Sequence, residues 1–294
     1  MTTQLGLSEE ARAPLTDPGD GTQAVLPELA MRTLSIVNVF LYGNPSTDGR
    51  FVLIDTGLPT SADTIRDCVE RRFGRDARPE AIIMTHAHFD HAGSVESLSR
   101  GWDVPVYAHP LEHPYLNGQA SYPPADPLVG GGVMALLSPL YPRSPVDVGP
   151  RLHMLPPDQS VPGMPGWQWV HTPGHTPGHV SLFRESDRTL IAGDAIVTTG
   201  QESAYAVMTQ RLEMHGPPRY LTPDWMEAET SVRLLAGLKP ELIVTGHGQP
   251  VHGLEAREKL DLLARDFREI AVPEGGHYDR KPAEPGKSEN DAYR

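Results

Sequence analysis

The chain has 294 residues and a formal net charge of −13 at pH 7, with 38 acidic residues against 25 lysines and arginines. This acidic balance argues against a long nucleic-acid partner, because phosphate binding needs a basic surface. No run of about 18 apolar residues occurs, so no membrane-spanning helix is expected, and a chain of this length can bury the core of one large domain.

Strands and helices are predicted in the first third of the chain, after a flexible start. Residues 1–30 carry Pro, Gly, Asp and Glu without periodicity, which predicts a flexible arm. Runs of β-branched and aromatic residues predict strands, and apolar residues at helical spacing predict helices. The strands are expected at 34–42, 51–55, 81–85 and 104–108, and the helices at 61–73 and 93–100.

Residues 110–165 differ from the rest because they are rich in proline and contain Gly130-Gly131-Gly132. Such a stretch cannot stay regular for long. Long ordered loops in compact domains are usually functional, so we expect this insert to form a wall or lid over a binding site.

Regular elements return after the insert. Strands are expected at 167–171, 179–185, 189–192 and 241–245, and helices at 224–238 and 253–270. Thr222 is the expected N-cap of the first of these helices, with Pro223 at its first position. This order predicts helices packed outside a sheet sandwich. We therefore expect one domain over 31–272, followed by a disordered tail at 273–294.

Four potential metal ligands lie close together in the segment Thr85-His86-Ala87-His88-Phe89-Asp90-His91. A strand would align His86, His88 and Asp90 but turn His91 away, and a helix would align His86 and Asp90 without His88. Since neither element presents all four together, the segment is predicted to be a loop that wraps a metal centre.

Further candidate ligands follow predicted strands in glycine-rich turns. His175 lies in Thr172-Pro173-Gly174-His175-Thr176, Asp194 follows Gly193, and His247 lies between Gly246 and Gly248. Imidazole and carboxylate ligands suit zinc, and also iron, manganese or cobalt. Because the set exceeds the four ligands of one tetrahedral ion, we predict two divalent ions, most simply zinc, that share a bridging carboxylate.

In chain order, the motifs H-x-H-x-D-H, T-P-G-H-T, G-D and G-H-G resemble those of the metallo-β-lactamase-fold hydrolase superfamily, over about residues 34–250. The resemblance implies an α/β fold, the four-layer αββα sandwich, with its site at the open edge between the sheets. It implies two metal sites joined by one bridging residue: the first formed by His86, His88 and His175, the second by Asp90, His91 and His247, and the bridge by Asp194.

The resemblance also implies roles around the metals. A hydroxide held between the two ions would attack the substrate, and Asp90, the predicted catalytic residue, would orient it or pass a proton to the leaving group. Asp55, in the segment Ile54-Asp55-Thr56-Gly57, resembles an early aspartate of the superfamily that supports the ligands from behind.

Departures from individual branches narrow the substrate class. True β-lactamases of this fold lack a histidine at the position of His91, which argues against a lactam. Acyl-homoserine-lactone lactonases carry a sizeable insert before the second motif, as this chain does, so small esters and above all lactones are the favoured substrates. Several lactonases place a tyrosine where this chain has Val197, and Tyr205 or Tyr220 is expected to serve instead. Within the proline-rich insert, Tyr115, Tyr122 and Tyr141 are further candidates for substrate contact.

Other functions remain open at this point. Glyoxalase II-like thioesterases share the T-P-G-H-T-P-G-H motif but carry a long C-terminal helical region, whereas only 47 residues follow His247 here. Persulfide dioxygenases use one iron and tend to lose ligands of the second site. A non-catalytic metal-binding module is the third alternative.

The expected partner is a small-molecule substrate, without nucleic acid or membrane. Cys68 is the one cysteine and cannot form an internal disulfide, which is typical of the reducing cytoplasm. The proline-rich insert could equally serve as a dimer contact, so a homodimer is an alternative assembly.

Overall fold

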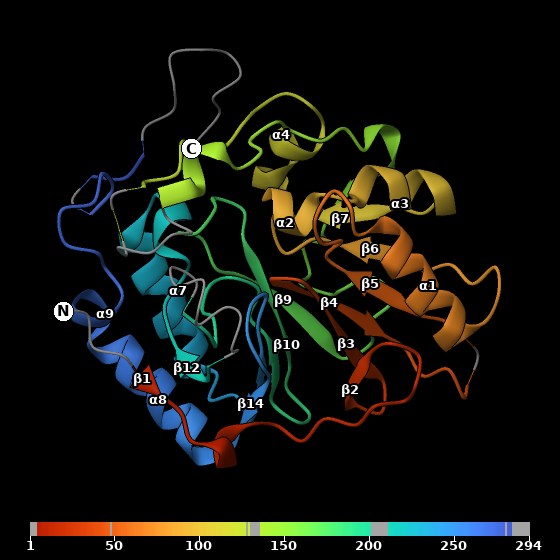
Figure 1. Cartoon of the computed structure of the whole chain (residues 1–294), viewed down its shortest axis with the longest axis horizontal. Coiled ribbons are helices and arrows are strands. Elements are labelled where there is room, and N and C mark those ends of the chain that lie inside the picture. The colour runs from red at the N-terminus through yellow and green to blue at the C-terminus, as the bar shows by residue number, and fades with distance from the viewer. Residues whose placement is uncertain are drawn as a thin grey trace.

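The computed structural model describes residues 5–47, 49–127, 129, 136–200, 211–279 and 281–283. Two mixed sheets pack face to face in this part of the chain, and helices cover their outer faces (Figure 1). The layers follow in the order helix, sheet, sheet, helix, which confirms the predicted αββα sandwich.

The larger sheet is formed mainly by the first half of the chain. Its strand order is β2 (Gln23–Leu26), β3 (Leu29–Leu34), β4 (Val37–Tyr42), β5 (Val52–Ile54), β6 (Ala81–Ile83), β7 (Val106–Ala108) and β8 (Leu152–Met154). Neighbours are antiparallel as far as β5 and parallel from β5 to β8. Parallel pairing brings the carboxyl ends of β5 and β6 to one edge.

The smaller sheet comes from the second half. Its order is β14 (Val251–His252), β13 (Leu242–Val244), β11 (Thr189–Ile191), β10 (Val180–Arg184) and β9 (Trp167–His171). A separate pair joins β1 (Leu5–Gly6) to β12 (Glu213–Met214).

Helices cover the outside of both sheets. On the larger sheet these are α1 (Ala62–Phe73) and α3 (Val95–Trp102); on the smaller sheet they are α7 (Trp225–Gly237), α8 (Gly253–Arg265) and α9 (Phe267–Ile270) (Figure 1). The short helices α2 (Phe89–Ala92) and α4 (His113–Leu116) lie near the open edge. None of the described helices combines the length and apolar character that crossing a bilayer requires.

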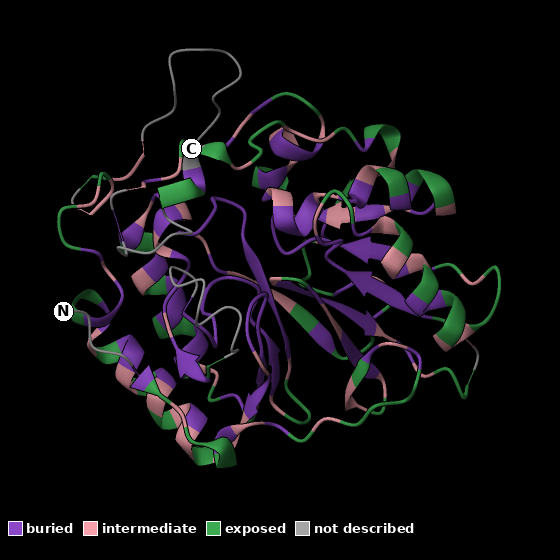
Figure 2. Cartoon of the chain, in the orientation of Figure 1, coloured by how far each residue is buried: buried purple, intermediate pink, exposed green. Residues whose placement is uncertain are grey.

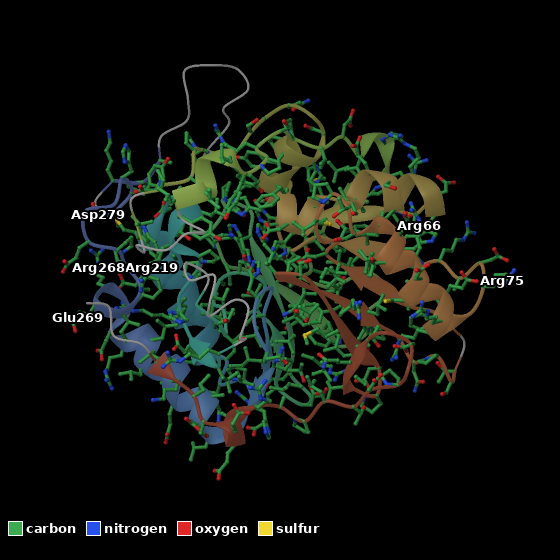
Figure 3. All side chains as sticks on the ribbon, viewed as in Figure 1. Arg66, Arg75, Arg219, Arg268, Glu269 and Asp279 are labelled. Atoms are coloured by element: carbon green, nitrogen blue, oxygen red, sulfur yellow. The ribbon has the colours of Figure 1, made fainter. Side chains whose placement is uncertain are left out.

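The core forms three layers because side chains alternate along the strands. In β4, Phe40 faces the other sheet, whereas Val39 and Leu41 face α1 and α3. On the far side, α7 and α8 pack against the smaller sheet. Figure 2 shows the strands almost wholly buried and the helices exposed along their outer faces. Labelled charged side chains such as Arg66, Arg75 and Glu269 lie at the periphery (Figure 3).

The ends of the domain differ from the sequence-based expectation. Within residues 1–30, expected as a flexible arm, β1 pairs with β12 and β2 extends the larger sheet. Ala11 and Ala13 are buried, and the backbone N–H of Ala13 donates to Pro250 O. This segment belongs to the fold because its small apolar residues cover an edge of the sandwich.

The described part of the tail expected at 273–294 is also held by contacts. The backbone N–H of His277 donates to the Asp126 carboxylate, and the Tyr278 hydroxyl donates to Pro124 O at 3.0 Å. These bonds tie residues 277–278 to the proline-rich insert, so the expectation of disorder is wrong there.

Two predicted elements are divided in the structure. The strand expected at 34–42 is divided by a hairpin turn that places Ser35 at φ 61°: Leu34 ends β3, and β4 begins at Val37. The helix expected at 253–270 breaks at Asp266 into α8 and α9. The helix expected at 224–238 begins at Trp225, with Asp224 as its cap, where the sequence had favoured Thr222.

Candidate metal centre

The predicted metal ligands meet at one edge of the sandwich, in turns that follow strands and in one short helix. His86 and His88 follow β6, Asp90 and His91 lie in α2, His175 lies between β9 and β10, Asp194 follows β11, and His247 follows β13. All seven side chains are buried, with at most 6% exposed. Their ligand atoms form three groups, each lying within 4.8 Å: His86, His88 and His175; His86, His91 and Asp194; and Asp90, His91 and His247.

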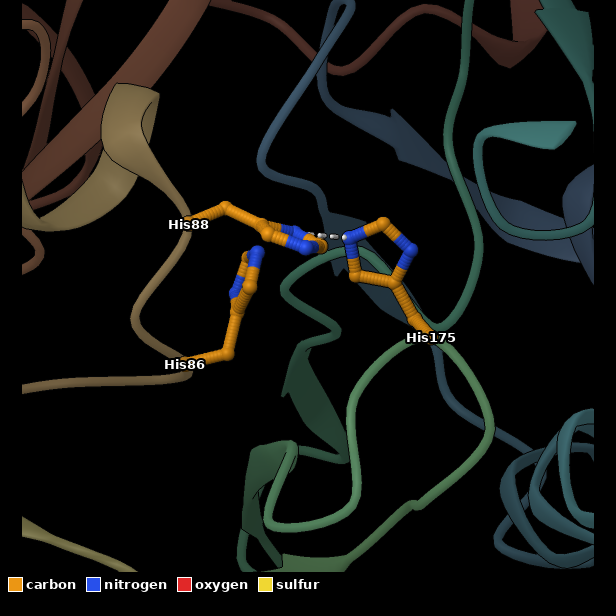
Figure 4. Close-up of side chains that lie close together, drawn as sticks. All are labelled: His86, His88 and His175. Atoms are coloured by element: carbon orange, nitrogen blue, oxygen red, sulfur yellow. Dashed lines mark hydrogen bonds between the residues drawn. The ribbon is translucent and has the colours of Figure 1, made fainter. Parts of the chain in front are cut away.

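The three-histidine group, defined as His86, His88 and His175, brings together loops from the two sheets (Figure 4). His88 Nδ1 lies 2.9 Å from His175 Nε2, and the ring centroids of His86 and His88 are 4.9 Å apart. Three imidazoles therefore converge on one point, which is the usual arrangement of a catalytic metal site with room for further ligands.

The mixed group consists of Asp90, His91 and His247. His247 Nε2 lies 3.4 Å from Asp90 Oδ2 and 3.1 Å from Asp194 Oδ2. Asp194 Oδ1 lies 3.5 Å from His91 Nε2, and Asp194 Oδ2 lies 3.5 Å from His175 Nε2. Asp194 thus lies between the two groups, at the position predicted for the bridge.

Hydrogen bonds behind the rings set the tautomers of His86 and His91. The Thr85 hydroxyl donates its proton to Asp55 Oδ2, so its oxygen can only accept from His86 Nδ1 at 3.0 Å. His91 Nδ1 lies 2.8 Å from Asp55 Oδ2 and donates to it. In both rings Nε2 is left to face the centre of the cluster.

The same logic holds for His175 and His247. The Thr222 hydroxyl donates to Pro218 O at 2.7 Å, so it accepts from His175 Nδ1. His247 Nδ1 donates to the backbone oxygen of Ile36. In His86, His91, His175 and His247, the ring nitrogen that points away from the cluster has a partner, which orients the nitrogen that points inward.

The electrostatics of the two groups differ. Burial holds the pKa of His88 at about 3 and keeps the pKa values of His86 and His175 well below their usual value. Burial opposes protonation of His91 too, but the carboxylates of Asp194 and Asp55 raise its pKa well above the usual value. The three-histidine group therefore offers neutral lone pairs, whereas the mixed group attracts positive charge.

The unsatisfied atoms of the cluster fit a cation. His86 Nε2, His91 Nε2 and Asp194 Oδ1 are buried and have no hydrogen-bond partner among the described residues. Buried polar atoms without a partner are costly, and here they are the inward-facing atoms of a histidine and carboxylate set that suits divalent metals.

Comparison with known proteins decides the family. The family model described as the metallo-beta-lactamase superfamily matches residues 32–247. The chain belongs to this superfamily. It is 48% identical, over 238 residues, to the probable metallo-hydrolase YflN of Bacillus subtilis (strain 168), an alignment that covers 81% of this chain and 90% of that protein.

Two further similarities lie within the superfamily. Hydroxyacylglutathione hydrolase of Erwinia tasmaniensis is 32% identical over 153 residues, which cover 52% of this chain and 45% of that protein. The crystal structure of the BLEG-1 B3 metallo-beta-lactamase superposes with a TM-score of 0.54 at 23% identity, covering 88% of this chain and 96% of that chain. The predicted superfamily and its fold are confirmed, and the chain is similar to metallo-hydrolases.

Gly193 and Gly246 let their loops approach the cluster closely. At Gly246 a Cβ would overlap Asp194 Oδ1 and lie against the His91 ring, so no side chain fits there. Gly193 has φ +56°, and a Cβ on it would lie 2.6 Å from His179 Nε2. That nitrogen accepts the backbone N–H of Asp194 at 2.9 Å, which fixes the bridging position.

Asp55 lies where the sequence predicted it, directly after β5 and behind the cluster. Besides the bonds to Thr85 Oγ1 and His91, it accepts the backbone N–H of Thr85 at 2.8 Å. Its φ of 58° lies in the left-handed region, which aspartate tolerates better than most residues. One carboxylate thus orients the loop of His86 and the ring of His91.

A pocket beside His88 is walled by the proline-rich insert. Tyr115 and Tyr122, expected to contact substrate, line it and stack on each other with ring centroids 3.9 Å apart. Phe89, Tyr141 and Leu221 add apolar surface. The insert is therefore a wall next to the candidate ligands, and the role of the two tyrosines toward a substrate stays a prediction.

Tyr205 and Tyr220 are the other candidates for substrate contact. Tyr205 lies outside the described residues. Val197 is buried and bridges to His215 through its backbone, and Tyr220 packs near Tyr141 with ring centroids 6.0 Å apart.

Two residues that support the ligands were not found by sequence reasoning. Thr222 orients His175, and Glu112 accepts hydrogen bonds from both histidine loops. Neither belongs to a motif with the ligands, and their spacing along the chain carries no periodic signal. The one sign of a role for Glu112 was its place in an apolar, proline-rich turn, because a buried acid rarely lacks hydrogen-bond partners.

Proposed function

We propose that this protein is a dinuclear metal-dependent hydrolase of small ester-type substrates, and that lactones such as acyl-homoserine lactones are its leading substrate class. The supporting observation is the apolar aromatic pocket that opens beside His88. A substrate whose apolar part fills this pocket would present its ester group to the cluster.

The seven clustered side chains would hold the ions: His86, His88 and His175 the first, Asp90, His91 and His247 the second, with Asp194 shared. Divalent cations bound there would supply activation of water and polarisation of the ester carbonyl. Zinc is our first candidate, and iron, manganese and cobalt suit the same ligands.

The chain's own residues would do the rest. The Asp90 carboxylate, 3.4 Å from His247 Nε2, would take up a proton at Oδ2 and pass it to the leaving group. The pocket walls exclude water from the apolar part of the substrate, which fixes the ester group next to the cluster.

The pocket also contains one polar group in need of a partner. The Ser138 hydroxyl is buried, lines the pocket and has no hydrogen-bond partner among the described residues. This hydroxyl is a candidate donor to a polar group of the substrate only if substrate binding moves the wall around it.

A thioesterase is the second candidate function, because the relative from Erwinia is a hydroxyacylglutathione hydrolase. The apolar lining of the pocket beside His88 favours a less polar substrate than a glutathione thioester.

Metal content and substrate turnover should be measured on the same sample. We expect about two metals per chain and hydrolysis of an acyl-homoserine lactone, with a glutathione thioester and an aryl ester as comparison substrates. Asp90→Asn should abolish turnover and weaken metal binding to the mixed group, to which Asp90 belongs, and the exposed Asp187→Asn serves as its control. Thioester turnover alone would favour the second function. One iron per chain with oxygen uptake on a persulfide would overturn both.

A further inference from the structure

Glu112 is a fully buried carboxylate at the start of the proline-rich insert, in the turn Pro110–Glu112. It accepts four hydrogen bonds. Oε2 accepts from the backbone N–H of Ala87 at 2.9 Å and from the Tyr122 hydroxyl. Oε1 accepts from the Thr176 hydroxyl and from the backbone N–H of Gly178, both at 2.8 Å.

Three of these four donors come from the two loops that carry the three-histidine group, and the fourth, Tyr122, lies in the insert. Ala87 lies between His86 and His88, and Thr176 directly follows His175. One side chain therefore spans the gap between a loop of the larger sheet and a turn of the smaller sheet. None of these hydrogen bonds reaches the mixed group, whose rings are oriented by Asp55 and by the backbone oxygen of Ile36.

The turn after His175 is shaped to admit this carboxylate. A Cβ on Gly178 would lie 2.8 Å from both the backbone nitrogen and Cγ of Glu112, so a side chain there would push the two segments apart. With four donors, a carboxylate satisfies its acceptor capacity at a buried site, which a neutral amide cannot do.

We propose that Glu112 is a positioning residue: it fixes the spacing of the two histidine loops and thereby sets the metal affinity of the three-histidine group independently of the mixed group. This inference rests on the proposed dinuclear site. A purely structural role would give a different result: loss of Glu112 would lower thermal stability and would not change one metal affinity more than the other.

Glu112→Gln tests the inference in the full-length protein. The glutamine keeps the size, and its oxygen can still accept from Thr176 and Gly178. Its NH₂ group then faces the N–H of Ala87, which is a donor against a donor. Zinc affinity should be measured by competition with a chromogenic chelator, and cobalt absorption spectra should report the ligand geometry.

Single-group backgrounds separate the two affinities. His247→Ala disables the mixed group and His175→Ala disables the three-histidine group. Adding Glu112→Gln should weaken zinc binding about 10–100-fold in the His247→Ala background, as loss of an outer hydrogen-bond partner typically does. In the His175→Ala background, the affinity should change less than about threefold, because no bond from Glu112 reaches that group.

Asp20→Asn is the matched control. Asp20 is likewise buried and accepts from the backbone and hydroxyl of Thr22 and from Arg72, which lies on α1 away from the cluster. Its loss should lower the melting temperature without changing either zinc affinity. If Glu112→Gln does not fold, Tyr122→Phe removes one of the four donors and should weaken the same group by a smaller factor.

The outcomes are distinct. Selective weakening of the three-histidine group, with activity recovered at excess zinc, supports the inference. Equal weakening of both groups, or lower thermal stability with unchanged affinities, overturns it. If the wild type binds a single zinc, the dinuclear proposal fails; Glu112 keeps its role only if the substitution weakens that zinc, and loses it otherwise.

Discussion

Asp55 and Glu112 are two buried carboxylates behind the same cluster, and they support it in different ways. Asp55 bonds directly to a candidate ligand, the His91 ring, and to Thr85, whose hydroxyl orients His86. Glu112 bonds to no ligand ring and instead accepts from backbone and hydroxyl groups next to the ligands. One carboxylate sets ring orientation, and the other sets the separation of two loops.

The difference follows from where each residue lies in the fold. Asp55 directly follows β5, which pairs with β6 in the same sheet, so parallel pairing brings Asp55 to the loop of His86. Glu112 comes from the insert and reaches across to the opposite sheet. A site made at the junction of two sheets thus needs both kinds of support, within one sheet and between the two.

Asp194→Asn removes the residue that lies between the two groups and should have the largest effect. Asp194 lies within 3.5 Å of His91, His175 and His247, and the amide would remove its negative charge. We expect loss of both metals and a fall in kcat/KM of about a thousandfold, or ~4 kcal/mol. Elemental analysis and steady-state kinetics measure this. A variant that keeps two metals and a tenth of the activity would contradict the shared position.

Gly246→Ala should disrupt the shared position without touching Asp55 or Glu112. The new Cβ would overlap Asp194 Oδ1, so that carboxylate must move away from the histidines. We expect about a hundredfold loss of kcat/KM, roughly 3 kcal/mol. Gly237→Ala is the matched control, because a Cβ there meets nothing within 4 Å at the end of α7. The control should keep full activity; a comparable loss in both variants would contradict the steric argument.

Asp55→Asn should mirror Glu112→Gln and sharpen the comparison. Asparagine tolerates the left-handed backbone at this position, so the change isolates the side chain. Because Asp55 orients His91, zinc binding in the His175→Ala background should weaken by about 10–100-fold. Chelator competition measures the affinity. Weakening confined to the three-histidine group would show that the two carboxylates do not divide their roles as described.

Asp20→Asn should give the smallest effect on function and a pH-dependent effect on stability. Burial raises the pKa of Asp20, but its hydrogen bonds from Thr22 and Arg72 outweigh burial and lower it. The ionised form therefore stabilises the fold above the ordinary aspartate pKa of about 4, and this contribution disappears as the pH falls through the lower folded-state pKa.

Denaturant unfolding checks the Asp20 prediction. We expect Asp20→Asn to cost about 2 kcal/mol at pH 7, with the gap to wild type closing in acid. A gap that stays constant down to pH ~2 would contradict the assignment.

Much of the candidate site could be predicted from the sequence because its residues follow strands directly. The segment from His86 to His91 cannot be presented by one helix or strand, and the structure indeed begins it as a loop and ends it in α2. Asp194 and His247 could be predicted in the same way, since glycines beside them indicate tight turns after short apolar runs.

The remaining features depend on contacts between distant segments. Glu112 is defined by donors at 87, 176 and 178, which no local pattern connects with it. β1 was missed because it is two residues long and its partner β12 lies in the last third of the chain. Thr222 looked like a helix cap, but its hydroxyl bonds to Pro218 O and His175, and Asp224 caps α7 instead.

Tyr122 belongs to the pocket wall and also donates to Glu112, so the two proposals together predict that a ligand in the pocket and a metal at the three-histidine group would be thermodynamically linked. A compound that binds against this tyrosine and strengthens its bond to Glu112 must favour the loop spacing that the metal requires. Free-energy coupling is reciprocal. Such a compound therefore strengthens metal binding by the same factor by which the metal strengthens binding of the compound. A chelator that removes the metal would weaken binding of the compound as well.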